Sequence, residues 1–420
     1  MSGMPEITCL ANGVRILTET MAQVRSISLG IWVKTGSRQD PAAQSGIAHF
    51  IEHMMFKGTK SRNALLIAKD IDALGGLLNA QTAKEYTVYY VKVLDEHLGK
   101  ASEVLFDIFL NSVFDAEELE KEKKVVLQEI RMTEDTPDDY IHDLFAEAFF
   151  HKTPLGVSIL GTTDTVNALA RDDILAFIAR AYDPGAIVVS GVGNLEHKQL
   201  VDLAAVRFGE LPSQERENVL EKPPMGGIRA IYVKDLEQIH FTLGTIGPAM
   251  RDEERWPYIV LNSILGGSMS SMLFQEAREK LGLVYSIYSY LSAYEDCGFM
   301  AVYAATTPEN ILKTMDVIGG QMRRLKHGDL SDIKLDDVKA QIRGNLLLAR
   351  ESTENRMSSI AKNEMYYQRD VPIEEVIRKI NAVNADAIVA LANEIFTSDK
   401  MTLVSLGQDH LEHIDLGTIL

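Results

Sequence analysis

The chain has 420 residues, which favours two domains or more, because a single hydrophobic core usually stops growing at about 250–300 residues. Hydrophobic residues make up 46% and charged residues 24%, the composition of an ordinary soluble globular protein. The 60 acidic and 42 basic residues give a formal net charge of −18, which excludes nucleic acid and anionic membranes as natural partners and favours cationic ligands such as basic peptides.

The two cysteines, Cys9 and Cys297, are too few for a disulfide framework or a thiolate zinc site, which indicates a reducing compartment. We expect each to be a small buried apolar residue. The first residues lack a basic segment followed by an apolar stretch, and Glu6 and Glu19 argue against a transit peptide. No apolar segment reaches the ~20 residues that a membrane-spanning helix needs. The expected location is therefore the cytoplasm, without a membrane anchor.

The first predicted element is a hairpin, because Asn12-Gly13 suits a tight turn between two apolar segments, residues 7–10 and 14–18. β-branched and aromatic residues then predict strands, and 3.6-residue periodicity predicts helices. The further elements expected in the first half are a strand at 27–34, a hairpin ending in a strand at 87–93, helices from 95 to about 150, a helix at 174–182 and a buried strand at 186–192.

Residues 209–227 combine proline, glycine and charge without an apolar period, which predicts a linker between a domain of residues 1–208 and one of residues 228–420. Beyond the linker the same order of elements returns at an offset of 214 residues, at which Asp172 aligns with Asp386. The segment 186–193 likewise aligns with 400–407. These matches indicate an internal duplication, and the alternative is two unrelated α/β domains.

The most specific motif lies in residues 45–59, SGIAHFIEHMMFKGT, which we predict to be a short helix with Ser45 as its N-cap. On this helix His49 and His53 project from one face about one turn apart, as two imidazoles must to share one ion. Glu52 lies on the neighbouring face. A single histidine is usually a surface or core residue, but this string arises by chance on the order of once in fifty such proteins. The pattern therefore predicts a catalytic zinc site that needs a third ligand from elsewhere.

This string resembles the inverted zinc motif of the pitrilysin and mitochondrial processing peptidase family, the inverzincins. In that family a glutamate ligand lies on a later helix, preceded by another acidic residue one heptad earlier. The resemblance implies that Glu129 is the third metal ligand and that Glu122 supports the site from the same face of the helix.

Two further segments resemble the same family. Residues 77–86, LLNAQTAKEY, are similar to its Asn-Ala segment on an edge strand, which implies that Asn79 and Ala80 contact an extended peptide substrate. Residues 273–285, LFQEAREKLGLVY, are similar to its segment with an arginine and a tyrosine. Arg278 and Tyr285 would thus bind substrate carbonyls and stabilise the developing oxyanion.

The resemblance implies an α+β fold of two homologous α/β sandwich halves, each a mainly antiparallel sheet packed with helices. It also implies a zinc metalloendopeptidase in which Glu52 activates water to cleave unfolded or short peptides, in particular basic ones, inside a chamber between two domains or two chains. We expect one zinc ion per chain, because the positions 214 beyond His49 and Glu129 are Ser263 and Arg343. A homodimer is expected, or a heterodimer with a related chain.

Three alternatives stay open at the level of sequence. The chain could be a catalytically inactive scaffold or peptide-binding subunit of the same family, although the intact motif argues against this. It could be a chaperone-like protein that holds extended chains, in which case it would contain no zinc. A zinc hydrolase that acts on a thioether would need a catalytic cysteine near the metal, and Cys9 has no supporting residues.

Overall fold

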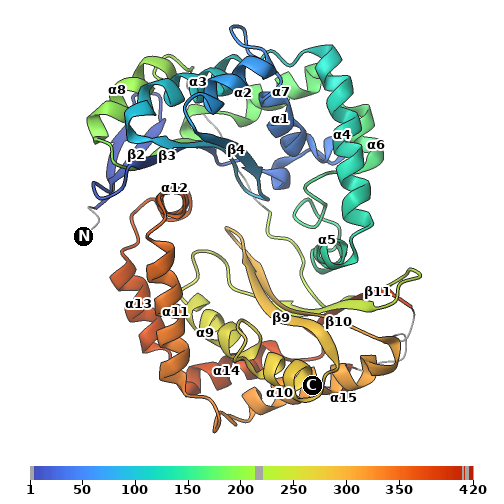
Figure 1. Ribbon diagram of the computed structural model, residues 1–420. Coiled ribbons are helices and arrows are strands. Elements are labelled where there is room, and N and C mark those ends of the chain that lie inside the picture. Colours follow the sequence, from blue (N-terminus) through green and yellow to red (C-terminus); the bar gives the residue numbers. More distant parts are fainter. Residues whose placement is uncertain (1–3, 213–220, 409–410, 412–415, 420) are drawn as a thin grey trace. The chain divides into compact units, whose positions relative to one another are not determined.

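The computed structural model describes residues 4–212, 221–408, 411 and 416–419, and it divides into two compact units (Figure 1). Unit 1 contains the described residues of Met1–Arg131, Ser158–Val219 and Leu347–Asp370. Unit 2 contains those of Met132–Val157, Leu220–Leu346 and Val371–Leu420. Each unit is therefore assembled from segments that are distant in the sequence.

Unit 1 is built around a six-stranded sheet with the strand order β1-β2-β6-β3-β5-β4. Only the pair of β2 and β6 is parallel, so the sheet is mainly antiparallel. Its strands are β1 (Glu6–Cys9), β2 (Arg15–Thr20), β3 (Ser26–Val33), β4 (Leu77–Thr82), β5 (Thr87–Leu94) and β6 (Ile187–Gly193). Its α-helices are α1 (Ile47–Met55), α2 (Ala64–Asp72), α3 (Leu98–Asn111), α4 (Ala116–Glu134), α6 (Thr163–Ala168), α7 (Arg171–Ala181), α8 (His197–Phe208) and α12 (Thr353–Tyr367), and short 3-10 helices are η1 (Ser37–Gln39), η2 (Ala42–Gln44), η3 (Asp95–His97) and η4 (Pro184–Ala186).

Unit 2 is built around a five-stranded sheet with the order β7-β11-β8-β10-β9, in which only β7 and β11 are parallel. Its strands are β7 (Arg229–Val233), β8 (Ile239–Ile246), β9 (Val284–Ala293), β10 (Gly298–Thr306) and β11 (Thr402–Gly407). Its helices are α5 (Pro137–Phe149), α9 (Arg255–Leu265), the π-helix η5 (Phe274–Lys280), the 3-10 helix η6 (Pro308–Asn310), α10 (Ile311–Lys326), α11 (Leu335–Ala349), α13 (Ile373–Ala382), α14 (Ala385–Ile395) and α15 (Leu416–Ile419).

The two sheets share one topology. When β1 is set aside, the strands of each unit lie in the order first, fifth, second, fourth and third along the sequence. The segments that align at an offset of 214 residues are β6 and β11, which occupy the same position in this order. The predicted α+β fold of two homologous halves is therefore confirmed.

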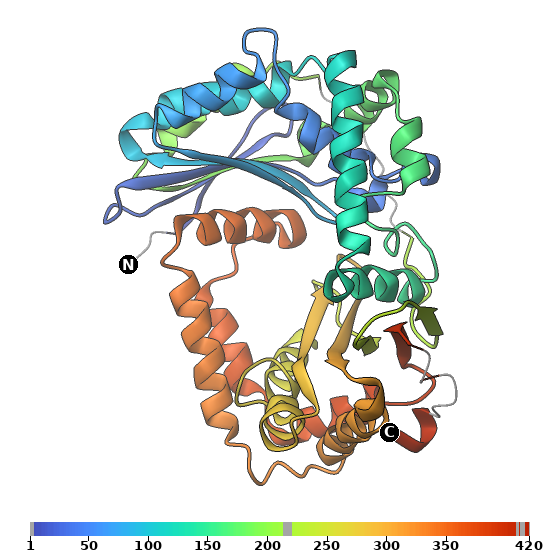
Figure 2. The same ribbon diagram turned by 45° about the vertical axis from the view of Figure 1, so that its right-hand side comes forward.

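Each sheet is covered on one face by the helices of its own half of the sequence and on the other by a helix from the other half. Along β3, Ile27, Leu29 and Ile31 face the helical layer, whereas Trp32 packs on α12. In unit 2, α5 packs in the same manner against β8 and β11. Figure 2 shows the orange α12 lying along the blue sheet of unit 1. Helices α5 and α12 correspond at the 214-residue offset. Each packs on the sheet of the other half of the sequence, so the two halves have exchanged equivalent helices.

Several sequence predictions can be checked here. The first hairpin forms as predicted, with Gly13 at a φ of 98°. Cys297 is buried, but Cys9 is exposed because it ends the edge strand β1, so the expectation for Cys9 is wrong. The domain division at residues 209–227 stays a prediction, and residues 213–220 of that linker lie outside the described residues. In the part of the chain that the structure describes, every helix is too short or too polar to cross a bilayer.

Candidate metal centre

The helix that carries the histidines, α1, is capped by a carboxylate from upstream. Ser45 was predicted to cap it, but the residue at the N-cap position is Gly46, with a φ of 92°, and the hydroxyl of Ser45 bonds Thr165 instead. Asp40 Oδ2 accepts a hydrogen bond from the Gly46 N–H at 2.8 Å, and its Oδ1 accepts one from the Ala48 N–H at 3.3 Å. These bonds occupy free N–H groups of the first turn, so Asp40 performs the role predicted for Ser45.

Two histidines of α1 and a glutamate of α4 converge as predicted. The imidazole rings of His49 and His53 lie 4.5 Å apart. Glu129 Oε2 lies 3.8 Å from His49 Nε2 and 3.5 Å from His53 Nε2. One potential ligand atom from each of the three residues falls within 4.8 Å of the others. The geometry thus brings two imidazoles and a carboxylate to one point.

Beside this group, Glu122 joins the histidine helix to α4. Its Oε1 accepts a hydrogen bond from His53 Nδ1 at 2.8 Å, and its Oε2 lies 2.6 Å from Lys57 Nζ. Because Nδ1 of His53 is taken, its Nε2 is the nitrogen left to face Glu129. Burial works to raise the pKa of Glu122, but the bonds from His53 and Lys57 outweigh it and lower the pKa below its ordinary value.

Glu52 is half-buried and held by the last residue of β4. Thr82 Oγ1 donates a hydrogen bond to Glu52 Oε2, and its backbone N–H also serves this carboxylate. Burial raises the pKa of Glu52, while these bonds and the nearby His53 oppose the increase. A carboxylate with a raised pKa is suited to accept a proton.

Burial also sets the protonation of the first histidine. Burial, together with the smaller effect of the neighbouring His53, lowers the pKa of His49 to about 3, so His49 is neutral at physiological pH. A neutral imidazole has the free lone pair that a metal ion requires.

The cluster fits a zinc ion. Among the described residues, two of its buried atoms, His49 Nδ1 and Glu129 Oε2, have no hydrogen-bond partner. Leaving a buried carboxylate oxygen unpaired is costly, and coordination to a cation would relieve that cost. Two imidazoles and one carboxylate are also a donor set that catalytic zinc sites use, with a fourth position left for water.

The two residues predicted to contact an extended peptide, Asn79 and Ala80, lie on an edge strand. Asn79 and Ala80 are in β4, the terminal strand of the unit 1 sheet, where they pair with Tyr90 and Tyr89 of β5. Strand β4 also packs beside α1 and carries Thr82 at its end. Among the described strands, β4 has a neighbour on one side only, and the same strand holds Glu52 through Thr82.

The structure also brings Arg278 and Tyr285 together. Arg278 lies in the π-helix η5, and Tyr285 is the second residue of the edge strand β9, with 79% of its surface exposed. The guanidinium carbon of Arg278 is 5.5 Å from the centre of the Tyr285 ring. Short π-helical segments are rare and occur frequently at functional sites, which is consistent with the role inferred for this pair.

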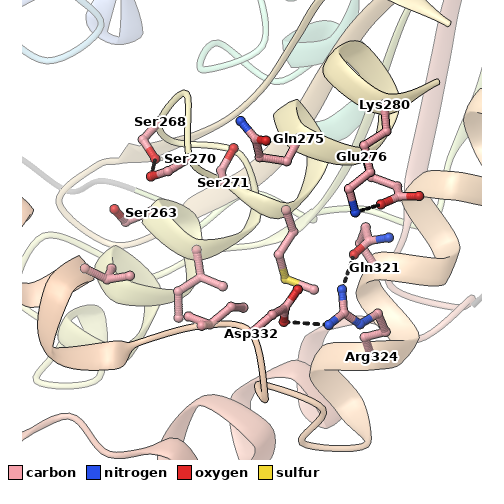
Figure 3. A pocket seen from close by; sticks show the side chains of 14 residues that line it. Ser263, Ser268, Ser270, Ser271, Gln275, Glu276, Lys280, Gln321, Arg324 and Asp332 are labelled. Atoms are coloured by element: carbon pink, nitrogen blue, oxygen red, sulfur yellow. Dashed lines mark hydrogen bonds and ion pairs between the residues drawn. The ribbon is translucent and has the colours of Figure 1, made fainter. Parts of the chain in front are cut away.

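A separate cavity of about 240 Å³ lies in unit 2 among α9, η5 and α10 (Figure 3). Serines, glutamines and two ion pairs line it, those of Lys280 with Glu276 and of Arg324 with Asp332. Its lining includes none of the site residues predicted from the sequence.

Three residues with contacts in the site were not identified from the sequence: Asp40, Lys57 and Thr82. Lys57 and Thr82 lie inside two of the segments that resemble the family, residues 45–59 and 77–86, but nothing in their spacing distinguishes them from neighbouring polar residues. Only the packing of α1 against α4 and β4 shows what their side chains contact.

Comparison with known proteins gives consistent matches along the chain. Residues 15–163 match the family model described as Insulinase (Peptidase family M16), and residues 168–342 match the one described as Peptidase M16 inactive domain. The uncharacterized zinc protease YmxG of Bacillus subtilis is 42% identical over 392 residues, which cover 93% of this chain and 95% of that protein. An uncharacterized zinc protease of Streptomyces coelicolor is 39% identical over 402 residues, covering 92% of this chain and 86% of that protein.

Solved structures support the same fold. A protease from Helicobacter pylori superposes with a TM-score of 0.88 at 24% identity, covering 97% of this chain and all of that one. A peptidase M16 inactive domain from Pseudomonas fluorescens gives a TM-score of 0.89 at 21% identity, covering 97% of this chain and 98% of that one.

Proposed function

Because this chain belongs to the insulinase family, peptidase family M16, we propose that it is a zinc-dependent endopeptidase with its metal held by His49, His53 and Glu129. The observation that carries this proposal is the convergence of both Nε2 atoms on one carboxylate oxygen of Glu129. In this role Glu122 fixes the ring of His53, and Glu52 is the general base.

The chemistry then divides between metal and protein. When bound, zinc activates water toward attack and polarises the scissile carbonyl. Glu52 accepts the proton of the attacking water and passes it to the leaving amine. Thr82 keeps one oxygen of this carboxylate occupied, which directs the other oxygen to the proton.

Substrate binding is the part that rests most on family resemblance. An extended peptide would add to the free edge of β4 through backbone hydrogen bonds, with Asn79 and Ala80 as neighbours. Arg278 and Tyr285 would supply donors to a substrate carbonyl and to the developing oxyanion. Backbone pairing makes little demand on sequence, so we propose unfolded or short peptides as substrates.

Charge suggests which peptides are preferred. The net charge of −18 would attract basic peptides and repel acidic ones, so cleavage of a basic peptide should be faster and should slow as salt is added. We also propose one zinc ion per chain, a homodimer or a pair with a related chain, and a cytoplasmic location. Sedimentation of the purified protein alone and with that related chain tests the assembly.

The decisive experiment compares the wild type with Glu52→Gln and Glu129→Gln. We expect Glu52→Gln to keep its zinc and to lose turnover of an unfolded basic peptide by a factor on the order of 10² or more, because glutamine cannot accept the proton. Glu129→Gln should lose both zinc and turnover. Glu117→Gln, an exposed residue at the start of α4, is the matched control and should behave as wild type.

The alternative is a catalytically inactive peptide-binding subunit of the same family. It would bind zinc and peptide without cleavage in the wild type. If Glu52→Gln cleaves as fast as wild type, the base is misassigned even though the protein is a peptidase.

A further inference from the structure

In the turn that follows α1, Lys57 forms an ion pair with Glu122, the residue that holds His53. Lys57 Nζ lies 2.6 Å from Glu122 Oε2, while the other oxygen of the same carboxylate bonds His53 Nδ1 at 2.8 Å. Lys57 and His53 are four residues apart, so both reach Glu122 from one side of α1 and its continuation. Building on the proposed function, we propose that Lys57 is a positioning residue that fixes the orientation of His53 through Glu122.

Lys57 acts on the carboxylate group of Glu122. Its side chain is 5% exposed, so little solvent is available to replace a lost partner. With one partner on each oxygen, the plane of the carboxylate is fixed, and the imidazole that it holds is fixed with it. Without Lys57, Glu122 would keep a single partner on Oε1 and could rotate about its last torsion. The Nε2 of His53 would then point toward the metal position for a smaller fraction of the time.

The backbone around Lys57 is itself held in place. The Lys57 N–H donates to Met54 O at 3.1 Å, which continues the last turn of α1. The next residue, Gly58, has a φ of 141°, and its carbonyl accepts a hydrogen bond from Val113 N at 3.1 Å. Thr59 N donates to Arg62 O at 2.7 Å. These bonds anchor the turn to the end of α3, so the lysine starts from a fixed position rather than from a free loop.

A simpler role for Lys57 would be that of a partly exposed ion pair, since its side chain is 29% exposed. Such a pair adds little to stability and nothing to metal binding. Zinc affinity distinguishes the two roles. A positioning residue changes the zinc affinity, and does so only through Glu122, whereas a surface ion pair leaves it unchanged.

The test measures the zinc dissociation constant by competition with a chromophoric chelator at one pH and ionic strength. We expect Lys57→Met to weaken zinc binding about tenfold, the lower end of the effect of removing an outer-shell partner. Lys57→Arg keeps the charge and should stay within about threefold of wild type. Lys60→Met removes the same charge from an exposed position in the same turn and should leave the affinity unchanged.

A double-mutant cycle shows whether Lys57 acts through Glu122. In a Glu122→Gln background, adding Lys57→Met should change zinc affinity less than about twofold, because the carboxylate that the lysine orients is gone. Thermal unfolding of the zinc-free variants verifies that each is folded, and Lys57→Gln replaces Lys57→Met under the same criteria if the latter does not fold.

The outcomes separate the inference from the proposed function. If the wild type binds zinc tightly and Lys57→Met binds it equally well, the role of Lys57 is refuted while the metal site stands. Independent, additive effects of Lys57→Met and Glu122→Gln would also refute it. A wild type that binds no zinc would overturn the proposed function together with this inference.

Discussion

Replacing Thr82 with valine removes the hydroxyl that holds the base while keeping a side chain of similar shape. Thr82 is 8% exposed, and its hydroxyl donates to Glu52 Oε2. A hydrogen bond to a charged group contributes about 1.5–3 kcal/mol, and the half-buried Glu52 can recover part of this from water. Most of that energy stabilises the ionised carboxylate before the reaction, so the cost to kcat comes from the lost orientation of Glu52. We expect it to be about 1.4 kcal/mol, which lowers kcat about tenfold.

The assay is steady-state cleavage of a fluorogenic peptide together with metal analysis. KM and zinc content should stay at wild-type values, because Thr82 bonds neither histidine nor Glu129. Thr82→Ser restores the hydroxyl and should recover most of kcat. If zinc-loaded Thr82→Val retains kcat within about twofold of wild type, then Glu52 does not need Thr82 to hold its position. The proposal that Thr82 binds one oxygen of Glu52 and leaves the other to accept the proton is then wrong.

Two further predictions concern stability. Burial raises the pKa of Asp40 from 3.8 to about 7, so the folded chain binds more protons than the unfolded chain in this range and loses stability as pH rises through about 7. Asp40→Asn should flatten this dependence in urea unfolding of the zinc-free protein between about pH 5 and pH 8, and an unchanged slope would refute the pKa assignment. Arg356 pairs with Glu19 inside unit 1, where their side chains are 4% and 0% exposed, so Arg356→Met should lower the free energy of unfolding by about 3–5 kcal/mol. Adding Glu19→Gln should recover part of the loss, and no recovery would show that the buried charge is not its cause.

Local features of the sequence predicted much of the fold. The Asn12-Gly13 turn and the His49, Glu52 and His53 spacing depend on residues that are neighbours along the chain, and the structure places them as expected. Glu129 lies far from the histidines in sequence, and charge-rich helices contain many glutamates, so spacing alone did not identify it. Family resemblance supplied the distance information that the single sequence lacks.

The contacts that the sequence did not predict are those made across space. Asp40 caps α1 from beyond the intervening η2, whereas Ser45, the nearest suitable residue, bonds elsewhere. The apolar face of α5 is visible in the sequence, but periodicity does not say which sheet a helix covers. The exchange of α5 and α12 depends on two sheets with equivalent faces, and these exist only once both halves have folded.

That exchange has a consequence for cutting the chain at the predicted linker. A fragment of residues 1–208 would retain α5, whose apolar face packs on strands of the other fragment. It would lack α12, so Trp32 and Val188 would be exposed to solvent. Neither half is therefore a self-sufficient folding module, and the two fragments should be soluble only when produced together. In a single ancestral repeat, the second face of the sheet would have been covered by the helix of an identical copy, as in a domain-swapped dimer.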